Sequence, residues 1–235
     1  MGMTLLKTKT ESTLLASYRL ISFDKIPSTQ TYAHELIASK RAADKTVILA
    51  EAQSAGRGRY RRQWVSHHGN LYASFIFNIE ERDPKLSYAV AVAVADAMIS
   101  FGISPNIKWP NDILIDGKKV CGILIEYAKD FVIIGIGVNI KSNPTIAKYE
   151  TTKLANYADV GRDEFLTRLM KSLDTWIGRD FSDVQKRWMN LALGLNKTIQ
   201  YRGHLAELIG INAEGALVLR IGSEYMMTYG DEISM

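Results

Sequence analysis

The sequence predicts an α+β fold: a central mixed, largely antiparallel sheet flanked by helices, followed by a small all-β region. Strand-like apolar runs are interspersed with few helical patterns over the first 140 residues, and short, glycine-punctuated runs take over after Lys197. A chain of 235 residues is long enough for one sizeable domain and a small one. We therefore expect one domain over 1–195 and a second over 196–235.

The composition is that of a globular protein without an internal disulfide or a membrane span. Hydrophobic content of 47% and charged content of 23% are ordinary for globular chains, and only the polar first dozen residues suggest disorder. A net charge of +4 permits nucleic acid, an anionic substrate or an acidic partner. The single cysteine, Cys121, excludes an internal disulfide and fits a reducing compartment. Without a signal-peptide pattern or an apolar run near the roughly 20 residues that span a bilayer, we expect a cytoplasmic protein with no membrane contact.

The first half of the chain alternates apolar strands with two helices. Runs over 16–23, 46–52 and 71–79 are apolar and predict strands. Ser28 is a good N-cap for a helix that ends near Lys40. A second helix is expected to begin at Asp83-Pro84, with Pro84 near its first turn and Gly102 just past its end. The body of this helix, 87–101, is small and apolar nearly all round, so we expect it to be buried.

Further strands and helices complete the pattern. Strands over 107–115 and 120–127 are joined at Asp116-Gly117, a strong hairpin signal. The run 131–140 is a very apolar strand whose two glycines, at 135 and 137, suggest close backbone approach by a ligand. A loop-like region over 141–159 precedes helices over 162–178 and 181–193. Gly194 ends the last helix, and the short strands beyond Lys197 predict a β-barrel of about 40 residues.

The segment 53–64, QSAGRGRYRRQW, has the strongest functional pattern. It lies between two predicted strands, holds four arginines and two glycines, and belongs to a stretch from 52 to 79 without an acidic residue. The planar guanidinium matches carboxylate and phosphate, and glycine lets backbone N–H groups approach an anion. The segment therefore predicts either an anion-binding loop or a solvated basic loop.

Three other polar segments could contribute to a site. The Ser28-Thr29-Gln30 segment could bind a polar group at a helix N-terminus or simply cap it. Residues 108–112, KWPND, place an amide and a carboxylate after a rigid Trp-Pro, or form a turn with a packed tryptophan. In 117–122, GKKVCG, Lys119 precedes an apolar strand and would need an anion if partly buried, whereas Lys118 suits an exposed hairpin.

Common catalytic patterns are missing from the sequence. The four histidines lack metal-ligand spacing, and no Cys-x-x-Cys, Gly-x-Ser-x-Gly or P-loop pattern occurs. What remains is a site rich in arginine and lysine without an evident nucleophile. That profile is typical of phosphoryl or nucleotidyl chemistry, in which positioning and charge stabilisation dominate.

Taken together, these segments resemble biotin protein ligase. The chain has STQ (28–30), QSAGRGRYRRQW (53–64), KWPND (108–112), KVCGILIE (119–126) and GIGVN (135–139), in that family's order and spacing. The resemblance covers residues 18–140 strongly and resumes in YGDEISM at the end, which is similar to the family's SH3-like domain. It implies the class II aminoacyl-tRNA synthetase-like catalytic fold of that family with an SH3-like β-barrel.

The resemblance implies an ATP- and Mg²⁺-dependent ligase. The family joins biotin to ATP, releases pyrophosphate, and passes the biotinyl group from biotinyl-5′-adenylate to one lysine of a biotin carboxyl carrier domain, such as that of acetyl-CoA carboxylase. About 18 residues precede the region of resemblance, too few for the helix-turn-helix of family members that act as repressors. We therefore expect the monofunctional kind, without DNA binding. Sheet-edge homodimers are known in the family.

Residue roles follow from the same resemblance. The matching positions that would contact biotin are Ser28, Thr29, Gln30, Gln53, Gly56, Arg57, Arg59, Lys119, Gly122 and Leu124. The catalytic positions would be Lys119, which bridges the biotin carboxylate and the α-phosphate, Arg59, which retains the adenylate, and Arg62, which reaches the triphosphate. ATP would be bound by Arg59, Arg62, Trp64, Asn111, Lys119 and Asn139, with Trp64 and Asn111 on either side of the adenine and Asn139 at its edge. Asp112 would help to place Mg²⁺. Arg61 falls on no ligand position.

Three positions depart from the family pattern. Gln30 replaces a usual asparagine, Asn70 a usual glycine, and Cys121 a common alanine. Asn70 is expected to place a side chain where the backbone approaches biotin. Two alternatives stay open at this point: a lipoate ligase or octanoyl transferase of the same fold, and a nucleic-acid-binding module that uses the arginine loop. The second lacks the interleaved aromatic residues and motifs of known binders.

Overall fold

The structure is a computed structural model that describes residues 8–12 and 17–229 of the chain. Expectations for 1–7, 13–16 and 230–235, which include the start of the first predicted strand and most of YGDEISM, lie outside the described residues. The chain forms two compact units: unit 1 comprises Met1–Arg82 and Lys118–Thr167, and unit 2 comprises Asp83–Gly117 and Arg168–Met235. The predicted boundary between 195 and 196 stays a prediction.

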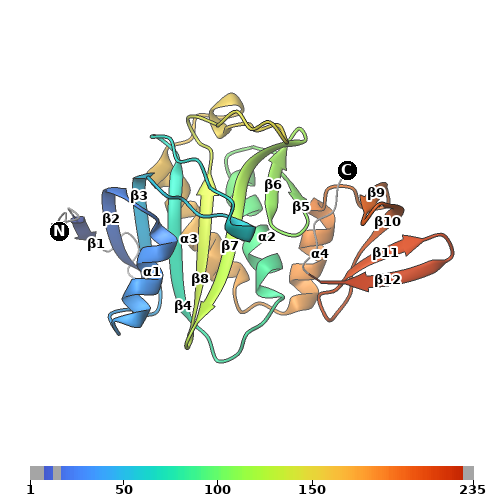
Figure 1. The fold of residues 1–235 in the computed structure, drawn as a ribbon, viewed down its shortest axis with the longest axis horizontal. Helices are drawn as coiled ribbons and strands as arrows, with labels where there is room; N and C mark the ends of the chain where they lie inside the picture. The colour runs from blue at the N-terminus through green and yellow to red at the C-terminus, as the bar shows by residue number, and fades with distance from the viewer. Residues whose placement is uncertain (1–7, 13–16, 230–235) are drawn as a thin grey trace. The chain divides into compact units, whose positions relative to one another are not determined.

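Unit 1 is built on a mixed sheet in the order β1-β2-β3-β4-β8-β7 (Figure 1). Among the described strands of this unit, β2 and β3 are the one parallel pair, and every other neighbouring pair is antiparallel, as predicted. The strands are β1 (Thr8–Ser12), β2 (Arg19–Ile26), β3 (Thr46–Gln53), β4 (Leu71–Asn78), β7 (Lys118–Ala128) and β8 (Phe131–Val138). The expectation of disorder over the first dozen residues is wrong at Thr8–Ser12, because this polar run pairs its backbone with β2.

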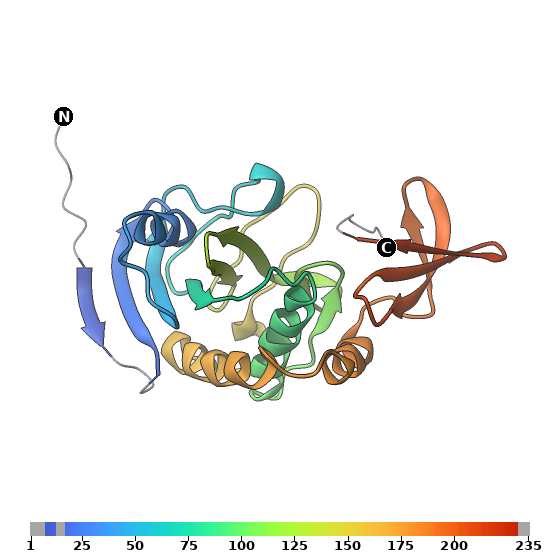
Figure 2. The same ribbon diagram turned by 90° about the horizontal axis from the view of Figure 1, so that it is seen from below.

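Helix α1 (Thr29–Ala38) covers part of one face of this sheet (Figures 1 and 2). The Ser28 hydroxyl accepts a hydrogen bond from the backbone N–H of Thr31 at 3.4 Å, as the N-cap prediction required. Apolar side chains of α1 and of the sheet form one buried cluster: Ile21, Phe23, Ile26, Ala33, Leu36, Ile37, Ile48, Ala50, Ile76 and Ile133. The helix N-terminus is thereby fixed above the middle of the sheet, next to β4 and β8.

In unit 2, helix α2 (Leu86–Ile99) is buried along most of its length, as predicted. It begins at Leu86 with Lys85 as N-cap, so Pro84 lies before the helix and not in its first turn. The predicted strand over 107–115 is wrong in one respect: it is two strands, β5 (Asn106–Lys108) and β6 (Asp112–Ile115), which pair with each other. A turn intervenes, where Pro110 follows a cis peptide bond and has no N–H for a ladder.

The rest of unit 2 is also close to expectation. Asp116 and Gly117 have φ values of 51° and 75°, as a two-residue hairpin turn requires. Helices α3 (Arg162–Trp176), which begins in unit 1, and α4 (Phe181–Leu191) occupy the predicted places. The C-terminal strands β9 (Thr198–Tyr201), β10 (His204–Ile211), β11 (Leu217–Ile221) and β12 (Glu224–Thr228) form an antiparallel sheet in the order β12-β11-β10-β9. The all-β C-terminal region is thus confirmed.

Candidate functional site

The N-terminus of α1 meets the end of β3 through a partly buried polar contact. The Thr29 backbone N–H and hydroxyl donate to Gln53 Oε1 at 2.9 and 3.2 Å. The Gln53 amide nitrogen donates in turn to Ser66 Oγ at 3.1 Å, beyond the arginine segment. Ser28, Thr29 and Gln53, predicted from separate motifs, therefore lie together at one end of the sheet.

Gln30 is held by protein groups on both sides of its amide. Its Oε1 lies 2.9 Å from the Ser74 hydroxyl, and its Nε2 lies 3.0 Å from Glu126 Oε2 and 3.4 Å from the carbonyl oxygen of Ile133. The side chain is buried against the bare backbone of Gly135, where a Cβ would come within 2.6 Å of Gln30 Oε1. A ligand contact through Gln30, as the resemblance implies, would exchange one of these bonds.

A lane of glycines runs beside α1 on the same face of the sheet. Gly122 of β7 lies directly opposite Gly137 of β8, and Leu124 lies opposite Gly135. A Cβ at Gly122 would be 2.7 Å from the ring of Trp64, and one at Gly137 would be 2.6 Å from it. The indole of Trp64 therefore lies directly on these two glycines, and the expected approach of a ligand to the β8 strand stays a prediction.

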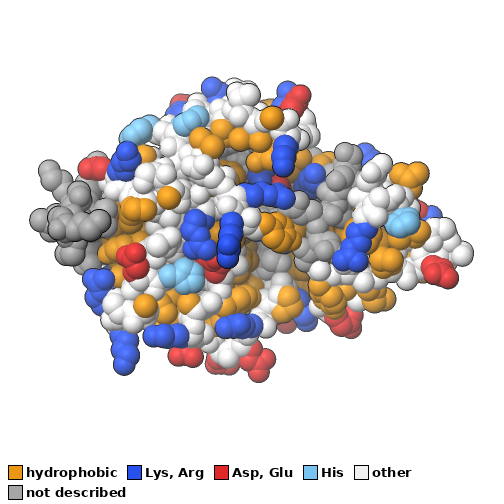
Figure 3. All heavy atoms as spheres, viewed as in Figure 1, with side chains coloured by type: hydrophobic (Ala, Val, Ile, Leu, Met, Phe, Trp, Pro, Cys, Tyr) orange, Lys and Arg blue, Asp and Glu red, His pale blue; other side chains and the backbone are white. Residues whose placement is uncertain are grey.

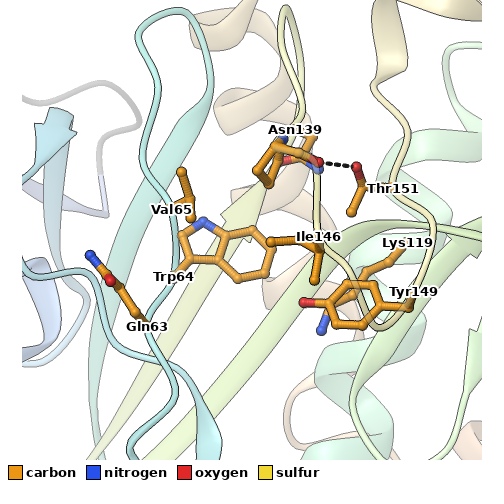
Figure 4. Close-up of a pocket in the computed structure, with 9 residues that line it drawn as sticks. Gln63, Trp64, Val65, Lys119, Asn139, Ile146, Tyr149 and Thr151 are labelled. Carbon is orange, nitrogen blue, oxygen red and sulfur yellow. Dashed lines mark hydrogen bonds between the residues drawn. The ribbon is translucent and has the colours of Figure 1, made fainter.

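Trp64 lines an open pocket, whose empty volume of about 290 Å³ includes solvent at its mouth (Figure 4). The pocket is lined by Gln63, Trp64, Val65, Lys119, Asn139, Pro144, Ile146, Tyr149 and Thr151. Lys119 Nζ lies 5.6 Å from the centre of the Trp64 ring and 5.4 Å from that of Tyr149. An ammonium group between two aromatic faces is favourably placed, and it remains close to whatever enters the pocket.

Two buried polar atoms of this pocket have no hydrogen-bond partner among the residues that the structure describes. They are Nε1 of Trp64, a donor, and Oδ1 of Asn139, an acceptor. The other end of the Asn139 amide is held, because Nδ2 donates to the carbonyl oxygen of Thr152 at 3.1 Å. Leaving a buried polar group unpaired costs about 1–3 kcal/mol. A ligand with both a donor and an acceptor would therefore complement this pocket.

The arginine segment folds as a short hairpin. The Trp64 N–H donates to the Gly56 carbonyl at 2.9 Å, and the Gly58 N–H donates to that of Arg62 at 2.8 Å. A turn of 3₁₀ helix, η1 (Arg59–Arg61), closes it. A Cβ at Gly56 would come within 2.4 Å of the Trp64 carbonyl oxygen, so no larger residue fits there. The segment is thus a defined structure that carries Trp64 at its base.

The arginines of this hairpin have different neighbours. Arg59 lies 5.0 Å from the centre of the Tyr60 ring and donates to the Tyr60 hydroxyl at 3.1 Å, and Arg62 lies 5.6 Å from the same ring. Arg57 reaches across to β7, where it pairs with Glu126 at 2.6 Å. Arg61 is exposed. Lys and Arg side chains gather over this hairpin on the face shown in Figure 3, and positive charge favours an anionic ligand there.

Glu126 is a member of the site that the sequence did not assign. Its carboxylate accepts from Gln30, from Arg57 and from the His34 ring nitrogen at 2.9 Å. Burial alone would raise the pKa of Glu126, but hydrogen bonds from His34 and Gln30 and the charge of Arg57 outweigh it and hold the pKa below its usual value. The carboxylate is therefore ionised at neutral pH. Its place at the end of KVCGILIE was the one available signal.

Asn70 departs from the family pattern without entering the pocket. Its Oδ1 accepts from three successive backbone N–H groups, those of Ile140, Lys141 and Ser142, at 2.9, 3.0 and 3.1 Å. Its Nδ2 donates to the Ser142 carbonyl at 2.8 Å. The side chain is buried and turned toward this segment, so it fixes the start of the loop that supplies Pro144, Ile146 and Tyr149 to the pocket.

Asn111 and Asp112 belong to unit 2. Asn111 lies in the turn between β5 and β6, and Asp112 begins β6 opposite Lys108. The adenine contact of Asn111 and the Mg²⁺ role of Asp112 stay predictions. Among residues 8–12 and 17–229, no group of three or more His, Cys, Asp or Glu could hold a metal ion. A single carboxylate nevertheless suits Mg²⁺, which commonly binds through one or two carboxylates, water and substrate phosphates.

These features define a protein suited to binding an anionic ligand. Its pocket lies over strands with glycines, beside a lysine and under the arginine hairpin. Sequence comparison gives the family. The chain belongs to the Biotin/lipoate A/B protein ligase family, which matches residues 22–139. The resemblance inferred from the motifs is thereby confirmed.

Individual relatives agree with this assignment. The bifunctional ligase/repressor BirA of Bacillus subtilis is 32% identical over an alignment of 240 positions. The alignment covers 92% of this chain and 74% of the relative. The biotin–[acetyl-CoA-carboxylase] ligase of Paracoccus denitrificans is 32% identical over 74% of this chain and 83% of its own. The solved structure of biotin protein ligase from Aquifex aeolicus in complex with biotin and ATP superposes with a TM-score of 0.78, at 27% identity, over 92% of this chain and 97% of that one.

Proposed function

We propose that this chain is a biotin protein ligase that makes biotinyl-5′-adenylate and transfers biotin to a carrier protein. The carrying observation is the pocket in unit 1, where Lys119 lies beside Trp64, the paired glycines 122 and 137 have no side chain beneath the Trp64 ring, and Asn139 offers an unpaired acceptor. The names of the relatives supply the substrates: biotin and ATP are bound in the Aquifex enzyme, and acetyl-CoA carboxylase is the target of the Paracoccus enzyme.

The first reaction joins two anions. A carboxylate oxygen of biotin attacks the α-phosphorus of ATP, the bond to the bridging oxygen breaks, and pyrophosphate leaves. Repulsion between the carboxylate and the triphosphate must be offset, and Lys119 is the cation that already lies in the pocket. A lysine held there supplies charge-assisted hydrogen bonds to both groups, and these are the strong ones.

The arginine hairpin acts as the cover of the intermediate. Arg59 and Arg62 now lie on the ring of Tyr60 and would turn toward the phosphates on ligand binding. The adenylate is a mixed anhydride that hydrolyses when water reaches it, so a cover that forms over the bound ligand keeps it intact. Mg²⁺, which Asp112 would help to place, neutralises phosphate charge when bound.

The adenine is assigned to the Trp64 pocket. Asn139 Oδ1 and Trp64 Nε1 offer the acceptor and the donor that a purine edge can complement. Because the indole lies on Gly122 and Gly137, a ligand that uses these glycines must displace the ring. Binding of such a ligand would therefore be coupled to a movement of Trp64.

In the second reaction the ε-amine of the acceptor lysine attacks the biotinyl carbonyl, the bond to the phosphate oxygen breaks, and AMP leaves. The partner is a biotin carboxyl carrier domain. Cytoplasmic location, function without DNA binding, and assembly as a homodimer complete the proposal. The single cysteine, Cys121, is buried and free, which suits a reducing compartment. In the described part of the chain, no helix is long and apolar enough to cross a membrane.

A transfer assay tests this function and its alternative together. The purified chain is incubated with ATP, Mg²⁺ and a biotin carboxyl carrier domain, and biotin or lipoate is offered in turn. Avidin blotting and intact mass should show one biotin per carrier on a single lysine and no lipoyl addition. Lipoyl transfer without biotin transfer would instead assign the chain to the lipoate branch of its family.

A further inference from the structure

One carboxylate ties together two parts of the site that are far apart in sequence. Glu126 Oε1 pairs with Arg57, and Oε2 accepts from both Gln30 and His34. The partners lie 69, 96 and 92 residues away along the chain. The Glu126 side chain is 25% exposed, so these bonds are partly shielded from water and are stronger than those of a surface pair.

On one side, Glu126 fixes the polar floor of the site. Its partner Gln30 lies on Gly135 and next to the Ser74 hydroxyl, and Ser74 Oγ is also 2.8 Å from Thr29 Oγ1. The single proton of Ser74 serves only one of these acceptors at a time. Thr29 continues the chain of contacts to Gln53. Residues that the resemblance assigns to biotin are thus linked by hydrogen bonds to Glu126.

On the other side, Glu126 holds the arginine hairpin. Arg57 pairs with Gln63 in the bridge of the hairpin, next to the Gly56–Trp64 hydrogen bond. The ion pair between Arg57 and Glu126 therefore also restrains Trp64, which lines the pocket. Arg59 and Arg62 contact Tyr60 of the same hairpin, whereas Arg57 reaches β7.

We infer that Glu126 is a positioning residue that closes the arginine hairpin over the intermediate by holding Arg57, in register with the floor of the pocket. It touches neither substrate nor reacting atoms; it sets how long the intermediate is retained. This inference rests on the proposed function, because retention is defined for biotinyl-5′-adenylate.

The test is the rate at which preformed biotinyl-5′-adenylate leaves the full chain, measured by chasing radiolabelled intermediate with excess unlabelled biotin. Glu126→Gln keeps the shape of the side chain and an acceptor for Gln30 but removes the charge that holds Arg57. We expect release to accelerate about 10- to 100-fold, as for the loss of a charged hydrogen bond. Arg57→Ala should accelerate release equally.

The double variant separates positioning from a general structural role. If Glu126 acts through Arg57, then R57A/E126Q releases the adenylate no faster than either single variant. Additive acceleration would mean that Glu126 acts through Gln30 and His34 alone and would overturn the inference. Wild-type release from E126Q, or from R57A, would overturn it as well. Arg57 is exposed, so R57A gives an answer even if E126Q does not fold.

A matched control is available in unit 2. Asp96 accepts from Arg187 and from the Trp176 indole, and its side chain is 23% exposed, close to the value for Glu126. Asp96→Asn should lower thermal stability without changing release, and equal acceleration in D96N would overturn the inference. If the wild-type chain forms no adenylate at all, the proposed function fails; if it forms adenylate and E126Q retains it, only the role of Glu126 fails.

Discussion

Gly137→Ala places a methyl group where the indole of Trp64 lies. The new Cβ would be 2.6 Å from Cε2 and Nε1 of the ring and 2.9 Å from Cζ2. Carbon atoms in contact are normally about 3.5–4.0 Å apart, so the ring or the strand must move by about 1 Å. Overpacking of this size costs about 1–3 kcal/mol. For a chain of this length that corresponds to a fall in Tm of roughly 2–12 °C.

The effect should depend on Trp64. In a Trp64→Ala background the space above the strand is open, and the same methyl group meets no ring. Gly137→Ala should then cost less than about 0.5 kcal/mol, so the double-mutant cycle gives a coupling energy near the full penalty. Biotin binding should be weakened in both Gly137→Ala variants, because Gly137 lies directly opposite Gly122, which the resemblance assigns to biotin, and the new methyl group remains in either background.

The assay is urea unfolding of the four proteins, paired with calorimetric titration of biotin. An equal cost of Gly137→Ala with and without Trp64 would refute the placement of the indole on the glycine lane. Unchanged biotin affinity in both Gly137→Ala variants would refute the use of this lane by the ligand.

Three further outcomes are expected. Arg59→Gly should still form biotinyl-5′-adenylate but release it, so that mass spectrometry finds biotin on many lysines of bystander proteins; a variant confined to its carrier would contradict the retention role. Asn70→Ala strands three backbone N–H groups and should lower the free energy of unfolding in urea by about 2–4 kcal/mol, whereas Asn70→Asp, which keeps the acceptor, should recover most of it; equal losses would contradict the capping role. Burial raises the pKa of Tyr72 from 10.0 to about 12, although hydrogen bonds with Asn70 and His67 lower it. The contribution of this hydroxyl to stability is therefore complete below pH 10 and is lost as the pH rises toward 12. Tyr72→Phe should lack this alkaline loss of stability, and the same loss in both proteins would contradict the role of Tyr72.

Local patterns were sufficient for most elements of the fold. Continuous apolar runs predict β3, β4 and β8, because a strand buried on both faces needs no polar alternation. Ser28 predicts the start of α1 through its side-chain oxygen. The split of 107–115 into β5 and β6 was missed because the polar KWPND segment was included in one strand, although its proline and its Asn-Asp pair are typical of a turn. The Trp109 indole in this turn donates to the Tyr88 hydroxyl at 3.2 Å, a contact with another element that local sequence does not reveal.

The candidate site likewise contains residues that local motifs identify and residues that they do not. The motifs identified Ser28, Thr29 and Gln53, which the structure brings together, and Lys119, Trp64 and Asn139, which line one pocket.

Glu126 and Asn70 could not be assigned from sequence, because their roles depend on partners about 70 to 100 residues away. A carboxylate at the end of a strand and an amide before one have no distinctive local pattern. Their function appears only when the strands are paired.

The most direct test of the central claim is the formation of biotinyl-5′-adenylate by the chain and by its Lys119→Ala variant. Purified protein is mixed with biotin, ATP and Mg²⁺ without carrier, and the intermediate and pyrophosphate are quantified by liquid chromatography and mass spectrometry. The wild-type chain should form one equivalent of each. Lys119→Ala should bind biotin in calorimetry but form adenylate at least about 100-fold more slowly, as expected when a main charge stabiliser is removed. Adenylate formation at the wild-type rate in Lys119→Ala, or none in the wild-type chain, would contradict the account.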